Sequence, residues 1–473
     1  MQLTQQRLIH LLLNSIAIFG VWIIYKMIEV NAIRGDEFLS YLHSDPRWTY
    51  TQIIQHIHGG ADNSYTHAIV LRWIFGLFGH TIIVQRLLSL CFWLLGSILL
   101  LRIVKTPNNK GFNSFLLFCV GFANFGFFLA TDGRFYSILF CLAVASLYVY
   151  FKKQQWKVFT SMIVFTGIQM LGLLTSPNFI VFQILFVVTH IAMMVWHDRK
   201  EAFFAIIKWE ACLLLSVVLY FSFFKVPYFH TYFLHGFFTS VAFSTGDIAT
   251  FVSIPFRWFM LPHFPFCSDR VDGMVFLLAV IGLTGYFAKK IVSAVRLYAQ
   301  VSKFFVLMAI FLLLGIGIQL VLYFLIGIPM WESRYYATVF FVLPLAVLSL
   351  LRDVLSIKIM LLICCLWFMR LVAVEYPKLE ARRMDLLKVS ELQLLVMNNP
   401  KPSLFIDQLE NRQSSQFVAM ANVYIRFPNL RDKIFLQVDS TSSERTAYFK
   451  RLSDWHYPIG LTFEADSAMF TIP

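Results

Sequence analysis

Two acidic motifs lie directly beside apolar runs and carry residue types that a reaction at a membrane surface needs. The first is the pair Asp36-Glu37, and the second is the segment Asp132-Gly133-Arg134-Phe135-Tyr136. A carboxylate at a membrane–water boundary can act as a general base toward a hydroxyl group that arrives from water. Arginine and tyrosine side chains suit the oxygens of a phosphate group. Because charged groups near hydrocarbon are costly, the two motifs indicate a site with a function or a partner.

Both motifs also have a purely structural interpretation. The first can be a pair of solvated loop acids, or it can pair with the nearby Arg34. The second can be a local pair between Asp132 and Arg134, with Tyr136 anchoring the chain at the interface. The functional interpretation requires that the two motifs meet on one side of the membrane.

Two further sets of polar residues are candidates for the same site. The segment from Glu332 to Tyr336 opens a late apolar run, and its Arg334 and Tyr335 suit a lipid phosphate. The alternative is an arginine that only extends to the headgroups. The second set consists of histidines whose spacing matches no specific metal-ligand pattern, which favours a structural role: His56, His58 and His67.

The composition is that of a membrane protein. The chain has 473 residues, of which 59% are hydrophobic and only 14% charged. A soluble domain is about half apolar and about a quarter charged. The net charge of +13 would suggest nucleic acid as a partner of a soluble protein. Here much of the excess lies in short loops between apolar runs, where it orients the chain, so we expect no nucleic-acid binding.

Apolar runs of about 20 residues recur along most of the chain, and each is long enough to cross about 30 Å of hydrocarbon. The runs are continuous rather than alternating, which favours helices over a barrel. The sequence therefore predicts an all-α polytopic transmembrane bundle of about eleven helices: Leu8–Ile28, Val84–Val104, Phe112–Ala130, Phe135–Phe151, Val158–Leu174, Phe179–Trp196, Phe203–Phe224, Met274–Lys289, Phe304–Ile328, Tyr335–Leu351 and Ile359–Tyr376.

Basic residues are concentrated in alternate loops, which places the N-terminus in the cytoplasm. With an odd number of spans, the C-terminus is then extracytoplasmic. The same parity puts five polar segments on the extracytoplasmic face: residues 36–37, 132–136, 175–178, 225–273 and 331–336. This clustering predicts one site on that face.

The chain divides into two parts. Residues 1–376 form the transmembrane module, which includes long external loops at 31–83 and 225–273. The apolar stretch Tyr65–Thr81 contains Arg72, Trp73 and two histidines, and it is too short for a confident span. It therefore predicts a helix lying on the bilayer. Residues 377–473 are charged, contain no spanning run and predict a small extracytoplasmic α/β domain. Its expected elements are a helix over Lys378–Val396 and strands over Ser403–Ile406 and Ile434–Val438.

These motifs resemble those of the polytopic GT-C glycosyltransferases, which use lipid-phosphate sugars. The bacterial branch in question is related to protein O-mannosyltransferases, lipid A aminoarabinose transferases and rhizobial lipopolysaccharide core transferases. Over roughly residues 8–350 the shared pattern runs in order: Asp36-Glu37, Phe78-Gly79, Arg86-Leu87-Leu88-Ser89, Asp132-x-Arg134-x-Tyr136, and Arg334-Tyr335 followed by Pro344. The chain departs from the family at Asp132, where Glu is commoner, and at Tyr65-Thr66-His67-Ala68, where His-Pro-Pro is frequent.

The resemblance implies an inverting sugar transfer from a polyprenyl-phosphate donor to a hydroxyl of an envelope lipid, glycan or protein. Asp36, in the pair with Glu37, would deprotonate or orient the acceptor. The leaving phosphate needs charge stabilisation, for which Arg134, Arg257 and Arg334 are candidates. Asp132 would hold the acceptor, orient Arg134 or help bind a divalent metal ion, and the metal dependence stays open.

The resemblance also implies a bacterial inner (cytoplasmic) membrane, with the reaction on the periplasmic side. Three alternatives remain at this point. The chain can be a transporter or flippase of lipid-linked sugars, although transporters favour binding near the membrane midplane. It can be an envelope-glycan polymerase, or a membrane scaffold whose external domain binds a partner.

Overall fold

The computed structural model describes eight main segments: residues 2–30, 35–59, 64–104, 129–152, 157–197, 200–224, 300–326 and 338–351. It also describes four short strands and isolated positions such as Phe115 and Tyr336. The described part is mostly helical. The predicted span Met274–Lys289 lies outside it, Phe112–Ala130 lies largely outside it, and Ile359–Tyr376 is described only at single positions or pairs of residues.

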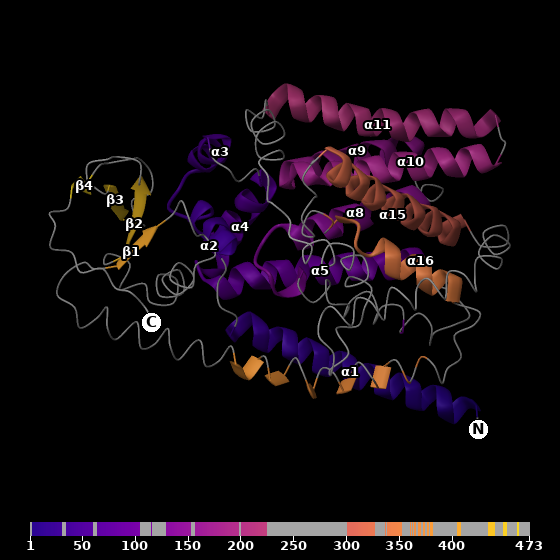
Figure 1. Ribbon diagram of the computed structural model, residues 1–473, viewed down its shortest axis with the longest axis horizontal. Helices are drawn as coiled ribbons and strands as arrows, with labels where there is room; N and C mark the ends of the chain where they lie inside the picture. The colour runs from indigo at the N-terminus through magenta and orange to yellow at the C-terminus, as the bar shows by residue number, and fades with distance from the viewer. Residues whose placement is uncertain are drawn as a thin grey trace.

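Long helices that run side by side form the body of the molecule (Figure 1). Helix α8 packs on α5 and α9, α9 packs on α11, and α10 and α16 pack on α15. Their bounds are α1 Gln2–Val30, α5 Ile82–Val104, α8 Tyr136–Lys152, α9 Val158–Thr175, α10 Ile180–His197, α11 Lys200–Phe224, α15 Gln300–Ile326 and α16 Val342–Leu351.

Within the described residues, four segments are long and apolar enough to cross a membrane: Ile82–Val104, Val158–Thr175, Pro177–Val195 and Val301–Gln319. They coincide with four of the predicted spans. Helix α8 is apolar but shorter, and α1 and α11 occupy two further predicted spans. The structure thus supports transmembrane helices, while the total of eleven and the orientation of the termini stay predictions.

Helix α8 lies at the centre of the bundle because it is apolar on nearly every side, which is typical of a buried helix. Its approach to α5 is close at Gly96. A Cβ atom there would lie 2.7 Å from the Phe140 ring and 3.2 Å from the backbone of Cys141. Glycine at this position therefore lets α5 and α8 pack with their backbones near each other.

Three short helices gather at one end of the long ones (Figure 1). They are α2 (Gly35–His43), α3 (Tyr50–Gly59) and α4 (Tyr65–Phe78). The α4 helix confirms the helix predicted over Tyr65–Thr81, and it ends at Gly79, whose φ of 93° favours glycine. Thr66 contacts the carbonyl of Leu171 near the end of α9.

Helix α3 was not expected from the sequence, although a capping box marks its start. The Thr49 hydroxyl accepts a hydrogen bond from the Gln52 backbone N–H (3.2 Å), and the Gln52 side chain accepts one from the Thr49 N–H (2.8 Å). This Thr-x-x-Gln pattern satisfies two backbone donors that the helix leaves unpaired.

The span predicted over Tyr335–Leu351 is shorter as a helix than expected. Tight turns precede it, and α16 begins only at Val342. Pro344 explains this start, because proline is tolerated in the first helical turn and not in the interior. The buried Tyr336, in the turn region, donates a hydrogen bond of 2.6 Å to Gln319 on α15.

Four strands in the C-terminal part form a sheet in the order β1-β2-β3-β4. Strand β1 pairs parallel to β2, and the other two pairs are antiparallel: β1 Leu404–Asp407, β2 Ile434–Asp439, β3 Tyr448–Arg451 and β4 Leu461–Thr462. The first two match the predicted strands. A parallel pair needs a long crossover connection, as an α/β domain supplies. The predicted helix Lys378–Val396 falls largely outside the described residues, so the domain as a whole stays a prediction.

The end of α9 offers a test of the packing. A Cβ atom on Gly172 would overlap the ring of the buried Phe179, whereas a Cβ atom on Gly167 would meet nothing within 4 Å. We expect Gly172→Ala to lower the free energy of unfolding by about 1–3 kcal/mol through overpacking. Gly167→Ala, the matched control, should be neutral or stabilise by up to about 1 kcal/mol. The free energy of unfolding of both variants is measured in mixed detergent micelles. Equal changes in the two variants would contradict the close packing of Gly172 on Phe179.

Candidate functional site

A buried ion pair between Arg86 and Glu37 lies where α2 meets α5. The Arg86 Nε and Nη2 atoms donate to the two carboxylate oxygens of Glu37 at 2.6 and 2.8 Å. The two side chains are only 1% and 2% exposed. The planar guanidinium group fits a carboxylate in this two-bond geometry, so the pair fixes both distance and orientation.

The same guanidinium group also binds the end of α1. Its Nη1 atom donates a 2.9 Å hydrogen bond to the carbonyl of Ile28. Carbonyls in the last turn of a helix have no partner within the helix and need one from outside. Arg86 therefore joins α1, α2 and α5 at one point.

The second sequence motif reaches this ion pair through Gly133. The Gly133 N–H donates to Glu37 Oε1 at 3.0 Å. The Gln85 side-chain amide donates to the carbonyls of both Glu37 (3.1 Å) and Gly133 (2.7 Å). A Cβ atom on Gly133 would lie 2.6 Å from Glu37 Oε1, so only glycine fits here without a shift. We call Glu37, Gln85, Arg86 and Gly133 the acidic junction.

The residues on either side of Gly133 are held in place as well. Asp132 is buried at 8% exposure. The Ser89 hydroxyl donates to the carbonyl of Arg134 at 3.3 Å. The Arg134 guanidinium donates to the Tyr136 hydroxyl at 3.0 Å and lies 5.2 and 5.0 Å from the ring centres of Phe135 and Tyr136. Aromatic rings and a phenol oxygen thus orient this cation near the junction.

The structure brings together some of the predicted site residues and leaves others outside the described part. Asp36 lies in the first turn of α2, next to Glu37, and its side chain is outside the described residues. Arg257, Arg334 and Tyr335 also fall outside them. What the structure joins is therefore the Asp36-Glu37 motif and the 132–136 motif.

Of the three histidines considered from the sequence, the structure describes the side chain of His67, whereas those of His56 and His58 lie outside the described residues. His67 is buried in α4, with its ring centre 6.3 Å from that of Phe135 in an edge-on contact. Among the described residues, no group of three or more His, Cys, Asp or Glu side chains is placed to hold a metal ion.

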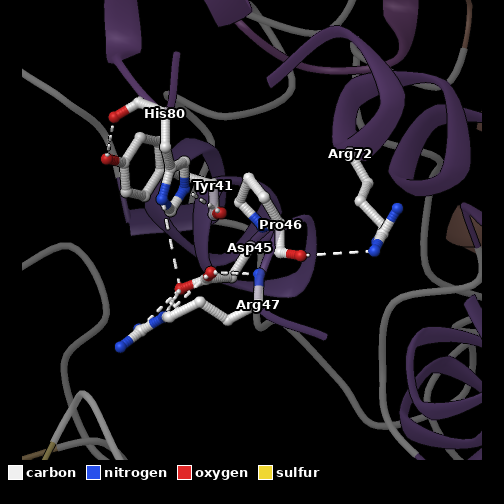
Figure 2. Close-up of polar contacts among 6 residues, drawn as sticks. All are labelled: Tyr41, Asp45, Pro46, Arg47, Arg72 and His80. Atoms are coloured by element: carbon white, nitrogen blue, oxygen red, sulfur yellow. Dashed lines mark hydrogen bonds and ion pairs between the residues drawn. The ribbon is translucent and has the colours of Figure 1, made fainter. Parts of the chain in front are cut away.

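A second polar cluster fixes the other end of α2 (Figure 2). Arg47 donates to Asp45 from its backbone N–H (2.9 Å) and its side chain (2.6 Å from Nη2), and His80 Nδ1 lies 4.0 Å from Asp45 Oδ2. The His80 ring stacks on Tyr41 with ring centres 3.9 Å apart. The Tyr41 hydroxyl donates to the His80 carbonyl at 2.8 Å. The turn between α4 and α5 is therefore attached to the last turn of α2.

Arg72 holds the segment that follows Asp45. Its Nε atom donates to the carbonyl of Trp48 at 2.5 Å, and its Nη2 atom donates to that of Pro46 at 3.2 Å. The guanidinium group also lies 4.2 Å from the centre of the Tyr50 ring. Helix α4 thus supports the connection between α2 and α3.

The environment of Asp45 shifts its pKa. Burial alone raises the pKa of this carboxyl, but the hydrogen bonds from the Arg47 side chain and backbone and the charges of His80 and Arg47 outweigh it. The pKa of Asp45 is therefore lowered from its ordinary value of 3.8. The carboxylate is ionised in the folded protein at neutral pH.

Several polar residues inside the bundle were not identified from the sequence. A hydrogen-bonded chain of buried side chains connects four helices: Ser146, Gln169, Gln183 and Ser216. A separate histidine–glutamate pair, His190 and Glu210, joins α10 and α11. The signal was available, because a polar residue within an apolar run usually faces other helices. Arg86 was seen only as part of a family motif, and its pairing with Glu37 could not be inferred from spacing.

Breaking the acidic junction should destabilise the protein strongly. We expect Glu37→Gln to lower the free energy of unfolding by about 3–5 kcal/mol, because the buried Arg86 charge loses the carboxylate that pairs with it directly, and Asp132 is only a weaker source of negative charge. The double variant Glu37→Gln/Arg86→Gln should recover part of this loss, because neither charge remains. The control is Glu29→Gln, in an ion pair whose side chains are 37% and 40% exposed. It should cost less than about 1 kcal/mol. Equal losses in the two single variants, measured by detergent unfolding, would contradict a buried ion pair.

The lowered pKa of Asp45 predicts a pH dependence of stability. Because the folded-state pKa lies below the unfolded value of 3.8, the ionised carboxylate stabilises the fold above that value. This contribution is lost as the pH falls through the folded-state pKa. Asp45→Asn should therefore lower the unfolding temperature at neutral pH and flatten its decline below about pH 4. If the unfolding temperature of Asp45→Asn fell at acidic pH as steeply as that of the unsubstituted protein, this contribution of Asp45 would be ruled out.

Comparisons with protein-family models, curated proteins and solved structures found no match for the chain. The GT-C resemblance therefore remains a prediction from the sequence motifs. The structure shows that the Asp36-Glu37 motif and the 132–136 motif are in direct contact, through Glu37 and Gly133.

Proposed function

We propose that the protein is a membrane glycosyltransferase of the GT-C type. It would transfer a sugar from a polyprenyl-phosphate donor to a hydroxyl group of an envelope lipid, glycan or protein. The reaction would take place at the end of the bundle that carries α2, α3 and α4, on the extracytoplasmic side.

The observation that carries this proposal is the hydrogen bond between Gly133 and Glu37. These residues are far apart in the sequence and yet lie 3.0 Å apart, N to Oε1. Asp36 and Asp132 are their immediate chain neighbours. Two carboxylate-bearing positions thereby come to one place beside an oriented arginine, which is what a base and a phosphate-binding group require.

The contacts divide the roles of the Asp36-Glu37 motif. Glu37 accepts hydrogen bonds from Arg86 and from Gly133, so we assign it a positioning role. Asp36 is then the residue that takes the proton from the acceptor hydroxyl. In this scheme the acceptor oxygen bonds to the anomeric carbon, and the bond from that carbon to the phosphate oxygen breaks with inversion.

The leaving phosphate carries away the electron pair of the broken bond, so it needs nearby positive charge. Arg134 is the described candidate, because Tyr136 and Phe135 already orient its guanidinium group. Arg257, Arg334 and Tyr335 are the further candidates from the sequence. Asp132 would hold the acceptor hydroxyl, orient Arg134 or help bind a divalent ion.

A flippase of lipid-linked sugars is the second candidate function, and one observation favours it. Buried polar side chains link α8, α9, α10 and α11 inside the bundle, where transporters bind their substrates. An envelope-glycan polymerase is a closer enzyme alternative. It differs from the proposed transferase in using an oligosaccharide on a lipid diphosphate as donor.

The test is the variant Asp36→Asn in cells and in proteoliposomes with a polyprenyl-phosphate sugar. We expect folding and membrane insertion to persist and transfer to fall by about 100-fold or more, as the loss of a general base predicts. Glu29→Gln, which removes an exposed carboxylate on α1, is the control and should keep full transfer.

Mass spectrometry of envelope glycolipids and glycoproteins gives the readout. A product heavier by one sugar that disappears in Asp36→Asn supports the transferase. Full transfer by Asp36→Asn would overturn the assigned base. Movement of the lipid-linked sugar across the bilayer without any sugar transfer would favour the flippase instead.

A further inference from the structure

The bundle contains a polar system that is separate from the acidic junction. Gln169 donates to the Ser146 hydroxyl at 2.7 Å, and Gln183 donates to the side-chain oxygens of Gln169 (3.2 Å) and Ser216 (3.4 Å). All four side chains are buried. Together they connect α8, α9, α10 and α11 through hydrogen bonds that an apolar core would lack.

Two turns farther along α10 from Gln183 lies an ionisable pair. His190 Nδ1 and Glu210 Oε1 are 2.8 Å apart and link α10 to α11. His190 is ten residues after the start of α10 at Ile180 and seven before its end at His197. At 1.5 Å per residue, the pair lies about 15 Å from one end of the helix, near its middle.

Each side chain of this pair also has a polar atom that takes no part in the hydrogen bond between them. His190 Nε2 and Glu210 Oε2 are buried, and neither has a hydrogen-bond partner in the described part of the protein. The ring of His190 is fully buried, with the rings of Tyr150 and Phe186 at centre distances of 5.2 and 5.7 Å. A buried polar atom without a partner is costly, and a structural link between two helices would not need one.

We propose that the His190–Glu210 pair is an intramembrane binding site for one proton. Without the proton, neutral imidazole donates from Nδ1 to the Glu210 carboxylate, and the pair carries one negative charge. The incoming proton forms an N–H bond at Nε2, and the pair becomes a neutral imidazolium–carboxylate. Both states keep the observed Nδ1–Oε1 hydrogen bond, so the proton enters and leaves at the atom that has no partner.

Two physical features suit the pair to this task. Histidine is the side chain that changes its charge between about pH 5 and pH 8. A net charge inside a helical bundle is unfavourable, and the bound proton removes it. Proton binding would thus change the electrostatic interaction between α10 and α11, which lets pH act on the packing of the bundle.

Few other titratable groups face the pair. Tyr150 from α8 contacts the imidazole ring, and α9 contains no titratable residue. Toward the same end of the bundle, the packed helices carry further titratable residues: Lys152 on α8, His197 on α10, Lys200, Glu201 and Lys208 on α11, and Lys303 on α15. Glu210 is the acidic group that is hydrogen-bonded to His190.

The experiment is nuclear magnetic resonance of the full chain in lipid nanodiscs with ¹⁵N-labelled histidine, between pH 4.5 and 8.5. The chain has twelve histidines. We expect the signal of His190 to change reversibly from unprotonated to protonated Nε2 as the pH falls. This signal should be missing in His190→Gln. In the unsubstituted protein, its contact with the Tyr150 ring assigns it independently, should that variant fail to fold.

The variant Glu210→Gln tests the counter-ion. Loss of the carboxylate should weaken proton binding at least about tenfold, because a nearby opposite charge favours the protonated imidazole. The controls His197→Gln on α10 and Glu201→Gln on α11 should leave the signal and its midpoint unchanged.

A His190 signal that keeps one protonation state over the whole pH range would overturn the proposal and leave only a link between two helices. An unchanged midpoint in Glu210→Gln would overturn the pairing. Since the proposed sugar transfer takes place at the acidic junction, its failure and the failure of this proposal are distinguishable.

Discussion

The ion pair between Arg86 and Glu37 is the interaction on which the arrangement of this end of the protein depends. A guanidinium group buried to 1% exposure must be neutralised and must find acceptors for its donors. Glu37 supplies the charge, and the carbonyl of Ile28 accepts a further hydrogen bond. Since these partners come from three helices, satisfying one cation fixes the ends of α1, α2 and α5 relative to one another. The hydrogen bond from the Gly133 N–H to Glu37 attaches the segment before α8 to the same point.

Helix α2 has only nine residues and would not be stable alone. It is attached at both ends, through Glu37 in its first turn and through Tyr41 and Asp45 at its far end. Two attachments restrict both the position and the rotation of a short helix. The backbone of Asp36, one residue before Glu37, is therefore held more firmly than an ordinary loop would hold it.

The sequence predicted what depends on local pattern and missed what depends on partners distant in the chain. Continuous apolar runs identified four helices that the structure supports as membrane spans, and the helix predicted over Tyr65–Thr81 is α4, which ends earlier, before Gly79. Helix α3 was predictable in principle from Thr49 and Gln52. The contact of Glu37 with Arg86 and Gly133 was not, because hydrophobic periodicity and charge spacing say nothing about which distant residues meet. For the same reason, nothing in the sequence indicates which residues on other helices pair with Gln183 and His190, each of which lies within an apolar run.

The Glu37 carboxylate and the His190–Glu210 pair differ in how many of their oxygen and nitrogen atoms have hydrogen-bond partners in the described part of the protein. Both carboxylate oxygens of Glu37 accept hydrogen bonds from Arg86, and one of them also accepts a hydrogen bond from Gly133, so this group holds the geometry of the acidic junction. In the His190–Glu210 pair, one hydrogen bond joins the side chains, and one further atom on each has no partner among the described residues. Proton exchange there breaks no existing contact, because it takes place at an atom that contributes nothing to the link between the helices. The end of the bundle is thus built to keep two motifs together, while its interior retains a group that can still change its charge.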